Sequence, residues 1–124
     1  MLGNEAQAAT TTLLLSPVSA ANTAAATSAW IDVRSYEGDI MFVNQVGALT
    51  GSIVWTIEDA TDGSGSGGAA IAANEGAYAA VTANSIQKRT VNANKVRGWV
   101  RCVGTITTGP ALVSVSISAR PKSV

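Results

Sequence analysis

The strict alternation of apolar and polar residues near the end of the chain most constrains its fold. Successive side chains of a β-strand point to opposite faces, so a period of two predicts one buried and one solvated face. The inward set of the last segment is Ala111, Val113, Val115, Ile117 and Ala119. Residues 96–106 alternate as well, with Val96, Val100, Cys102 and Ile106 on one face and Arg97, Trp99, Arg101 and Thr105 on the other. Residues 107–110 are Thr-Thr-Gly-Pro, which favours a turn, so the two segments predict a long antiparallel hairpin.

Weaker versions of the same pattern precede this hairpin. We expect strands at residues 29–35, 40–46, 52–58 and 85–91. Turns are expected at residues 36–39, 47–51 and 92–95. In the third of these strands Ile53, Trp55 and Ile57 are expected to face inward, or the opposite set to do so if the sheet is covered. Short strands joined by small polar turns are typical of all-β domains, and the sequence predicts an antiparallel β-sandwich or jelly roll.

We divide the chain into an N-terminal extended arm and one β-sandwich domain. Residues 1–28 are rich in Ala and Thr and contain a first short strand at 10–15, and residues 29–124 form the sandwich. The connector after the first strand either is loosely packed or orders against a partner. A secretory signal is not predicted, because the apolar run is three leucines where about 7–15 apolar residues are needed. No stretch approaches the ~20 apolar residues of a membrane-spanning helix, so no membrane partner is expected.

Two internal segments carry weaker signals. Residues 62–68, Asp-Gly-Ser-Gly-Ser-Gly-Gly, are expected to form a mobile surface loop, since Gly loses the most backbone entropy on ordering. The loop fits a calcium-binding pattern only in part, and it lacks the Lys-Ser/Thr ending of a phosphate-binding loop. Residues 69–73 fit either a helical turn or a short buried strand. For residues 78–82 we expect an extended return strand.

The chain lacks residue types on which most catalytic sites depend. The chain has no His, and its single cysteine, Cys102, lies on the apolar face of a predicted strand. The adjacent acids Glu58 and Asp59 would point to opposite faces of a strand, so they do not form a carboxylate pair for hydrolysis. We therefore predict no enzyme activity, no metal and no cofactor. A single cysteine also allows no internal disulfide.

The charges are balanced overall but divided sharply along the chain. The net charge is zero, which gives no general attraction to nucleic acid, and no nucleic-acid partner is expected. Eight carboxylates and one base, Arg34, lie at or before Glu75, and seven bases with no acid follow, so the two parts carry −7 and +7. These charges either pair within one sheet or face different neighbours, as in a head-to-tail ring of subunits.

Several short segments, in a set order, carry a resemblance to a known family. They are residues 30–40 (WIDVRSYEGDI), 45–47 (QVG), 51–52 (GS), 57–65 (IEDATDGSG) and 107–110 (TTGP). Over residues 30–122 the chain resembles the head decoration, or cement, proteins of tailed bacteriophages. The resemblance implies a β-sandwich or jelly roll, no catalytic residue, and a homotrimer seated where capsomers meet. It also implies synthesis in the host cytoplasm and a place on the virion, at the capsid surface.

The function expected on this basis is that of a structural virion protein that binds the outside of the capsid. It would stabilise the shell by bridging neighbouring subunits of the major capsid protein. We expect contacts with that partner, or with other copies, at Lys88, Arg89, Arg97, Trp99, Arg101, Asp32, Asp39 and Glu58. Trp99 either lies at such a contact or covers the core. The alternative is a carbohydrate-binding or adhesin-like module, with an aromatic platform drawn from Trp30, Trp55, Trp99, Tyr36 and Tyr78.

Overall fold

A computed structural model describes residues 9–122 and shows an all-β chain. Within these residues there are eight strands and one 3-10 turn, η1 (Ala93–Lys95). The strands are β1 (Thr10–Ala20), β2 (Ile31–Asp32), β3 (Tyr36–Leu49), β4 (Ser52–Ala60), β5 (Ala69–Ile71), β6 (Ser85–Asn92), β7 (Trp99–Thr107) and β8 (Ala111–Pro121). The side chain of Asn92 accepts a hydrogen bond from the backbone N–H of Asn94 at 2.8 Å and so caps η1. The turn predicted at residues 92–95 is confirmed.

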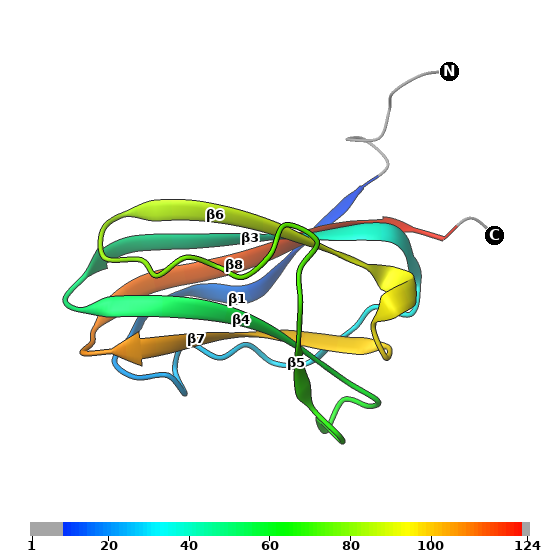
Figure 1. Cartoon of the computed structure of the whole chain (residues 1–124), viewed down its shortest axis with the longest axis horizontal. Coiled ribbons are helices and arrows are strands. Elements are labelled where there is room, and N and C mark those ends of the chain that lie inside the picture. The colour runs from blue at the N-terminus through cyan, green and yellow to red at the C-terminus, as the bar shows by residue number, and fades with distance from the viewer. Residues whose placement is uncertain (1–8, 123–124) are drawn as a thin grey trace, which may run out of the picture.

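The strands form two four-stranded antiparallel sheets, which pack face to face as the two layers of Figure 1. Sheet A has the strand order β1-β8-β3-β6, and sheet B has the order β2-β7-β4-β5. The first strand pairs with the eighth, the second with the seventh, the third with the sixth and the fourth with the fifth. This is the pairing of an eight-stranded jelly roll. The predicted fold class is therefore confirmed.

The inward-facing residues of both sheets fill the space between the layers. In β4 the side chains of Ile53, Trp55 and Ile57 are buried, as the alternation predicted, and the inward set of β8 is buried as well. Fully burying one such aliphatic side chain stabilises the fold by ~1.5–3 kcal/mol. Gly104 of β7 makes room for them, because a Cβ there would lie 2.6 Å from Cδ1 of Ile53 and 2.9 Å from Cζ3 of Trp55.

The predicted hairpin between residues 96–106 and 111–120 is wrong, because its two arms lie in different sheets. β7 pairs with β4 and β2, whereas β8 lies between β1 and β3. Each arm still buries one face, Val100 and Cys102 in sheet B and Val115 in sheet A. Alternation predicts which side chains are buried but not which strand is the neighbour. Residues 108–110 are long enough to cross the ~10 Å between packed sheets, at ~3.3–3.6 Å per residue.

Two connections that run from one sheet to the other, β3 to β4 and β7 to β8, pack against each other at one end of the sandwich. Thr50 and Gly51 connect β3 to β4, and the N–H of Thr50 donates to the carbonyl of Pro110 at 3.0 Å. A Cβ on Gly51 would overlap the carbonyl oxygen of Thr107, so only glycine fits where the crossings meet. The glycines of both predicted turns therefore let two backbones approach closely rather than form hairpins.

The N-terminal region is part of the sandwich from residue 10 onward. β1 continues to Ala20, beyond the expected end at residue 15, and pairs with β8 along its length. The connector after β1 is packed, because Ala26 is fully buried and its carbonyl accepts a hydrogen bond from the N–H of Gly104 at 3.1 Å. The hydroxyl of Ser28 accepts another from the N–H of Cys102 at 2.9 Å. The part of the predicted arm before residue 9 lies outside the described residues.

Three of the weaker expectations need correction. The strand expected at residues 29–35 is reduced to β2 (Ile31–Asp32). The corner expected at 36–39 lies inside β3, where Gly38 has a φ of 71° and the register with β8 shifts, so the strand is bent by a bulge rather than ended. The return strand at 78–82 is reduced to a bridge between Val81 and Ile53. Its alanines have low strand propensity and offer little surface for pairing.

Candidate functional site

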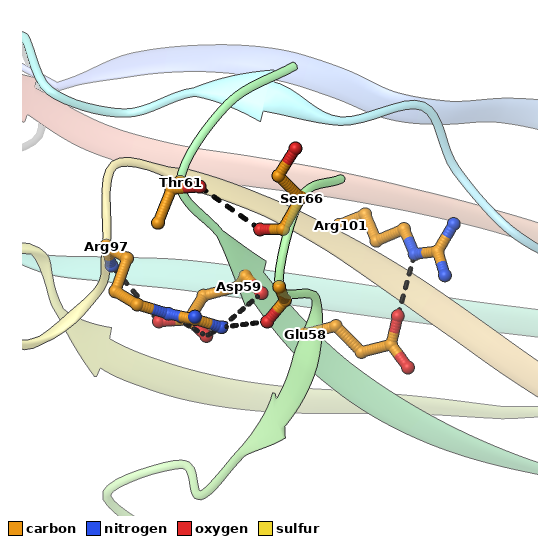
Figure 2. A network of polar contacts seen from close by, with 7 residues as sticks. Glu58, Asp59, Thr61, Ser66, Arg97 and Arg101 are labelled. Atoms are coloured by element: carbon orange, nitrogen blue, oxygen red, sulfur yellow. Dashed lines mark hydrogen bonds and ion pairs between the residues drawn. The ribbon is translucent and has the colours of Figure 1, made fainter. Parts of the chain in front are cut away.

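The outer face of sheet B brings together several of the predicted contact residues. Glu58 of β4 and Arg101 of β7 are direct cross-strand neighbours, and Nε of Arg101 donates to Oε1 of Glu58 at 2.7 Å (Figure 2). The Arg101 guanidinium also lies 4.6 Å from the ring centroid of Trp30, a cation–π arrangement. Opposite charges across an antiparallel pair contribute ~0.2–1 kcal/mol. The pair thus ties β4 to β7 within one subunit.

A second ion pair closes one end of sheet B. Asp59 is 3% exposed, and its carboxylate accepts hydrogen bonds from Arg97, at 3.0 Å from the backbone N–H and 2.8 Å from Nη2 (Figure 2). The same Nη2 donates to the carbonyl of Gly67 at 2.7 Å. Buried carboxylates persist when they are paired and hydrogen-bonded in this way. Sequence reasoning missed the role of Asp59, although the alternation of β4 already placed this acid on the inward face.

These contacts bear on the two explanations of the charge division. Besides the pairs of Glu58 and Asp59, Asp32 lies beside Arg34, with 2.7 Å between Oδ2 and Nη2. The hydrogen bonds from Arg34 hold the pKa of Asp32 below its ordinary value. Glu58 and Asp59 therefore meet bases of the second part of the chain inside the same subunit, whereas Arg34 belongs to the same part as Asp32. The first two pairs support pairing within the monomer.

Three of the predicted contact residues lie apart from the others, on sheet A. Asp39 belongs to β3, and Lys88 and Arg89 belong to β6. Lys88 is exposed, whereas Arg89 donates to the carbonyls of residues 76 and 77 and stacks on the ring of Tyr78 at 5.0 Å. The eight predicted residues therefore do not form one continuous surface.

The Gly/Ser loop at residues 62–68 is held by hydrogen bonds at its base. Oδ1 of Asp62 accepts from the backbone N–H of Ser66 at 3.2 Å and from that of Ser64 at 2.9 Å. A side-chain hydrogen bond from Ser66, followed by these backbone bonds, holds the pKa of Asp62 below its ordinary value. The hydroxyl of Thr61 donates to the carbonyl of Ser66 at 3.2 Å (Figure 2). The loop is thus organised by its own polar groups.

The glycines of this loop give space to two tryptophan rings of sheet B. A Cβ on Gly63 would lie 3.0 Å from Cζ3 of Trp99, and one on Gly65 would lie 2.6 Å from Nε1 of Trp30. The Arg34 guanidinium lies 5.7 Å from the ring centroid of Trp99. Trp99 is therefore half-buried by contacts within its own subunit. A run expected to be only a flexible loop covers the aromatic part of the sheet.

The aromatic platform of the carbohydrate-binding alternative is not formed. Trp55 and Tyr78 are buried in the core, at 2% and 8% exposure. Trp30 and Trp99 are half-buried and lie against the loop at residues 62–68. Sugar-binding platforms need ring faces open to solvent, so Trp55 and Tyr78 do not contribute to one, and the five aromatics do not lie on one open face.

We predict that Gly65→Ala opens this loop. Gly65 has a φ of 84°, and its new methyl group would meet Trp30, so the loop must move away and expose the indole. Tryptophan emission should shift to longer wavelength and be quenched more strongly by acrylamide. Gly76→Ala is the matched control, because Gly76 also has a positive φ, 95°, but nothing within 4 Å of its Cβ position. Equal quenching in the two variants would contradict the packing of the loop on Trp30.

A small buried polar cluster joins the two sheets. The hydroxyl of Tyr78 donates to Oδ1 of Asn44 at 2.6 Å, and Nδ2 of Asn44 donates to Sγ of Cys102 at 3.2 Å. Burial raises the pKa of the Cys102 thiol to about 12, and it raises the pKa of Tyr78 well above its ordinary value. A thiol that keeps its proton is a poor nucleophile. The cluster therefore supports the core and offers no catalytic group.

We predict that alkali destabilises the protein through Cys102. In the unfolded chain this thiol ionises near its ordinary pKa of about 8.5, whereas in the folded chain it keeps its proton up to about pH 12. The unfolded state then binds fewer protons, so stability falls as pH rises through this window, by ~2 kcal/mol between about pH 8 and pH 10. Urea denaturation at the two pH values measures this loss. Cys102→Ala should remove most of the pH dependence, and an unchanged slope in that variant would refute the assignment.

The outer face of sheet A carries a feature that the sequence analysis missed. A groove of about 820 Å³ opens there between strands β1, β8, β3 and β6. Three exposed apolar residues, Leu112, Ile86 and Val18, belong to its lining. Gly47 lies between its walls, and a Cβ there would be 3.3 Å from Cβ of Leu112. The available signal was the position of Leu112, an apolar residue on the otherwise polar face of β8.

Within residues 9–122, no group of three His, Cys, Asp or Glu side chains gathers in a way that would hold a metal ion. In the same part of the chain, no helix has the length and apolar character needed to cross a membrane.

The fold defines the chain as a two-sheet jelly-roll protein. No known protein family matches the sequence, and no curated protein matches it. Among solved structures, the fold is similar to that of the SPBc2 prophage-derived protein YomS, with a TM-score of 0.55 and 13% sequence identity. The similarity covers 90% of this chain and 92% of that one. At this identity it establishes the shared fold alone.

Proposed function

We propose that this chain is a structural protein of a phage virion that binds the outside of the capsid. There it bridges neighbouring capsomers and stabilises the shell, with the major capsid protein as its partner. The function is mechanical, so it requires neither a catalytic group nor a cofactor.

The fold similarity to YomS is the observation that carries this proposal. It extends over nearly the whole of both chains, so it concerns the complete jelly roll rather than a common supersecondary motif. YomS is a prophage-derived protein, and residues 30–122 of this chain independently resemble phage decoration proteins. Jelly rolls serve many functions. It is the agreement between a sequence resemblance and a fold similarity that favours the phage assignment.

The physical properties of the domain suit a bridging role. The ion pairs of Glu58 with Arg101 and of Asp59 with Arg97 link β4 to β7 and to the segment before it, which stiffens sheet B. A specific contact of about 1,600 Å² is ordinary between proteins, and repetition over a shell adds avidity. Each bound copy would then oppose the opening of a seam under internal pressure.

The test is binding to DNA-free shells assembled from the major capsid protein of the phage or prophage that encodes this chain. We expect co-sedimentation that saturates at a fixed number of copies per capsomer, and shells that withstand heating better. Unassembled capsid protein is the control, because it lacks junctions between capsomers and should bind far more weakly. Absence of shell binding, or equal binding to the unassembled protein, would contradict the proposal. A strong and specific glycan-array signal would instead favour host-surface attachment.

A further inference from the structure

The groove on sheet A is lined by residues of β1, β3 and β8 and by residues 84–86 at the start of β6. Gln45 of β3 lies opposite Ile86 of β6 on one side and Ser114 of β8 on the other, and the Ser114 hydroxyl is 3.0 Å from Oε1 of Gln45. Farther along the sheet, Leu112 lies opposite Ser19 of β1. Small residues thus form the hollow, and larger apolar residues stand beside it.

The apolar side chains that line this groove are unusually exposed to solvent. Ile86 is 63% exposed, Leu112 48% and Val18 37%. Single exposed apolar residues are ordinary on protein surfaces, but a cluster of them around a hollow marks an interaction site. All twelve residues that line the groove are uncharged. The outer face of sheet B differs, because its charges are paired there and its tryptophans are packed against a loop.

The edges of sheet A are poorly suited to pair with another strand. Pro17 in β1 lacks an N–H, and the register of β1 with β8 shifts on either side of Leu15. At the opposite edge, Gln87 and Arg89 of β6 hold the segment at residues 76–79 through its carbonyl groups. A partner of this sheet is therefore directed to its face rather than to its edges.

We propose that the occupant of this groove is a second copy of the same chain, packed face to face about a twofold axis. In such a contact a residue near the axis meets its own counterpart, so any charge there would face a like charge. A groove without charged lining residues satisfies this condition. The exposed Ile86 and Leu112 side chains of one copy then enter the hollow of the other. Lys88, the next outward residue of β6 after Ile86, remains at the rim, where solvent screens it.

The size of the face agrees with a stable pair. Four strands ~4.8 Å apart, over about eight residues of ~3.3 Å each, give roughly 500 Å² in projection. Side-chain relief raises the accessible area toward the ~800 Å² that each partner buries in a standard interface. The twofold pair is an alternative to the homotrimer that the resemblance implies. It does not depend on the proposed capsid function, because it is measured on the free protein.

Light scattering coupled to size exclusion, over a wide range of protein concentration, tests the pair. Wild-type protein should have the mass of two subunits. Leu112→Asp should weaken the association ~100-fold or more, because it places like charges close together at the axis. Val54→Asp is the matched control, since Val54 is 37% exposed on the outer face of sheet B, and it should leave the pair intact. Urea midpoints of both variants report whether the fold is retained, and Ile86→Lys replaces Leu112→Asp if that variant unfolds.

Three results would overturn the proposal. They are a monomer at all concentrations, a mass of three subunits, and a pair that neither Leu112→Asp nor Ile86→Lys weakens. If the wild type is a monomer that binds shells, and Leu112→Asp abolishes that binding, the groove belongs to the capsid protein. That outcome would refute the pairing while supporting the proposed function. A stable pair that does not bind shells would support the pairing and contradict the proposed function.

Discussion

Asp59→Ala is expected to lower the free energy of unfolding by about 2–3 kcal/mol. The Asp59 side chain is 5% exposed, and it accepts hydrogen bonds from both the backbone and the guanidinium of Arg97. Alanine leaves the Arg97 N–H without its partner and separates β4 from the segment that leads into β7. Breaking a fully buried pair costs ~3–5 kcal/mol. The expected loss is smaller here because the Arg97 side chain is 41% exposed and can be hydrated.

Asp32→Ala is the control for this prediction. Asp32 also pairs with an arginine, Arg34, but the two side chains are 39% and 67% exposed. Exposed pairs contribute little, because water and salt screen them. Urea denaturation followed by circular dichroism should therefore show a much smaller loss for Asp32→Ala than for Asp59→Ala. Similar losses in the two variants would show that the burial of Asp59 is not what makes its ion pair important.

Burial of side chains could be predicted from the sequence better than the pairing of strands. The alternation around Trp55 and Val115 identified inward residues correctly, because one buried face imposes a period of two on any strand. The same pattern left open whether consecutive strands share a sheet or face each other across the core. In this chain β7 and β8 lie in different sheets. Gly109 looked like part of a hairpin turn because such a turn and a close backbone contact both need an unhindered backbone.

The candidate sites were harder to predict, because they depend on contacts between distant segments. The charge division showed that acids and bases are separated along the chain, and the structure brings Glu58 to Arg101 inside one sheet. The role of Gly65 could not be predicted, since the run around it has the composition of a flexible linker and the ring it accommodates, Trp30, belongs to a distant segment. The groove on sheet A required the register of four strands, which alternation alone does not supply.

Trp55→Ala is expected to have the largest effect of the substitutions considered, with a loss of ~3–5 kcal/mol. Trp55 is 2% exposed and belongs to the core cluster that also contains Ile53 and Tyr78. Gly104 faces it from β7, so no larger neighbouring side chain is there to close the cavity that alanine leaves. A loss of this size is a large part of the ~5–15 kcal/mol that keeps a typical domain folded. Circular dichroism should show a variant that is marginally folded or unfolded at room temperature.

Two further substitutions test whether position rather than chemistry explains this effect. Trp99→Ala removes the same side chain from the half-buried outer face of sheet B, and its loss should be clearly smaller because solvent already reaches that ring. Trp55→Phe retains an aromatic ring in the core and also removes the indole N–H of Trp55, which has no hydrogen-bond partner within the described residues. It should therefore restore most of the stability that alanine loses. If Trp99→Ala were as damaging as Trp55→Ala, the centre of stability would lie under the loop at residues 62–68 rather than between the two sheets.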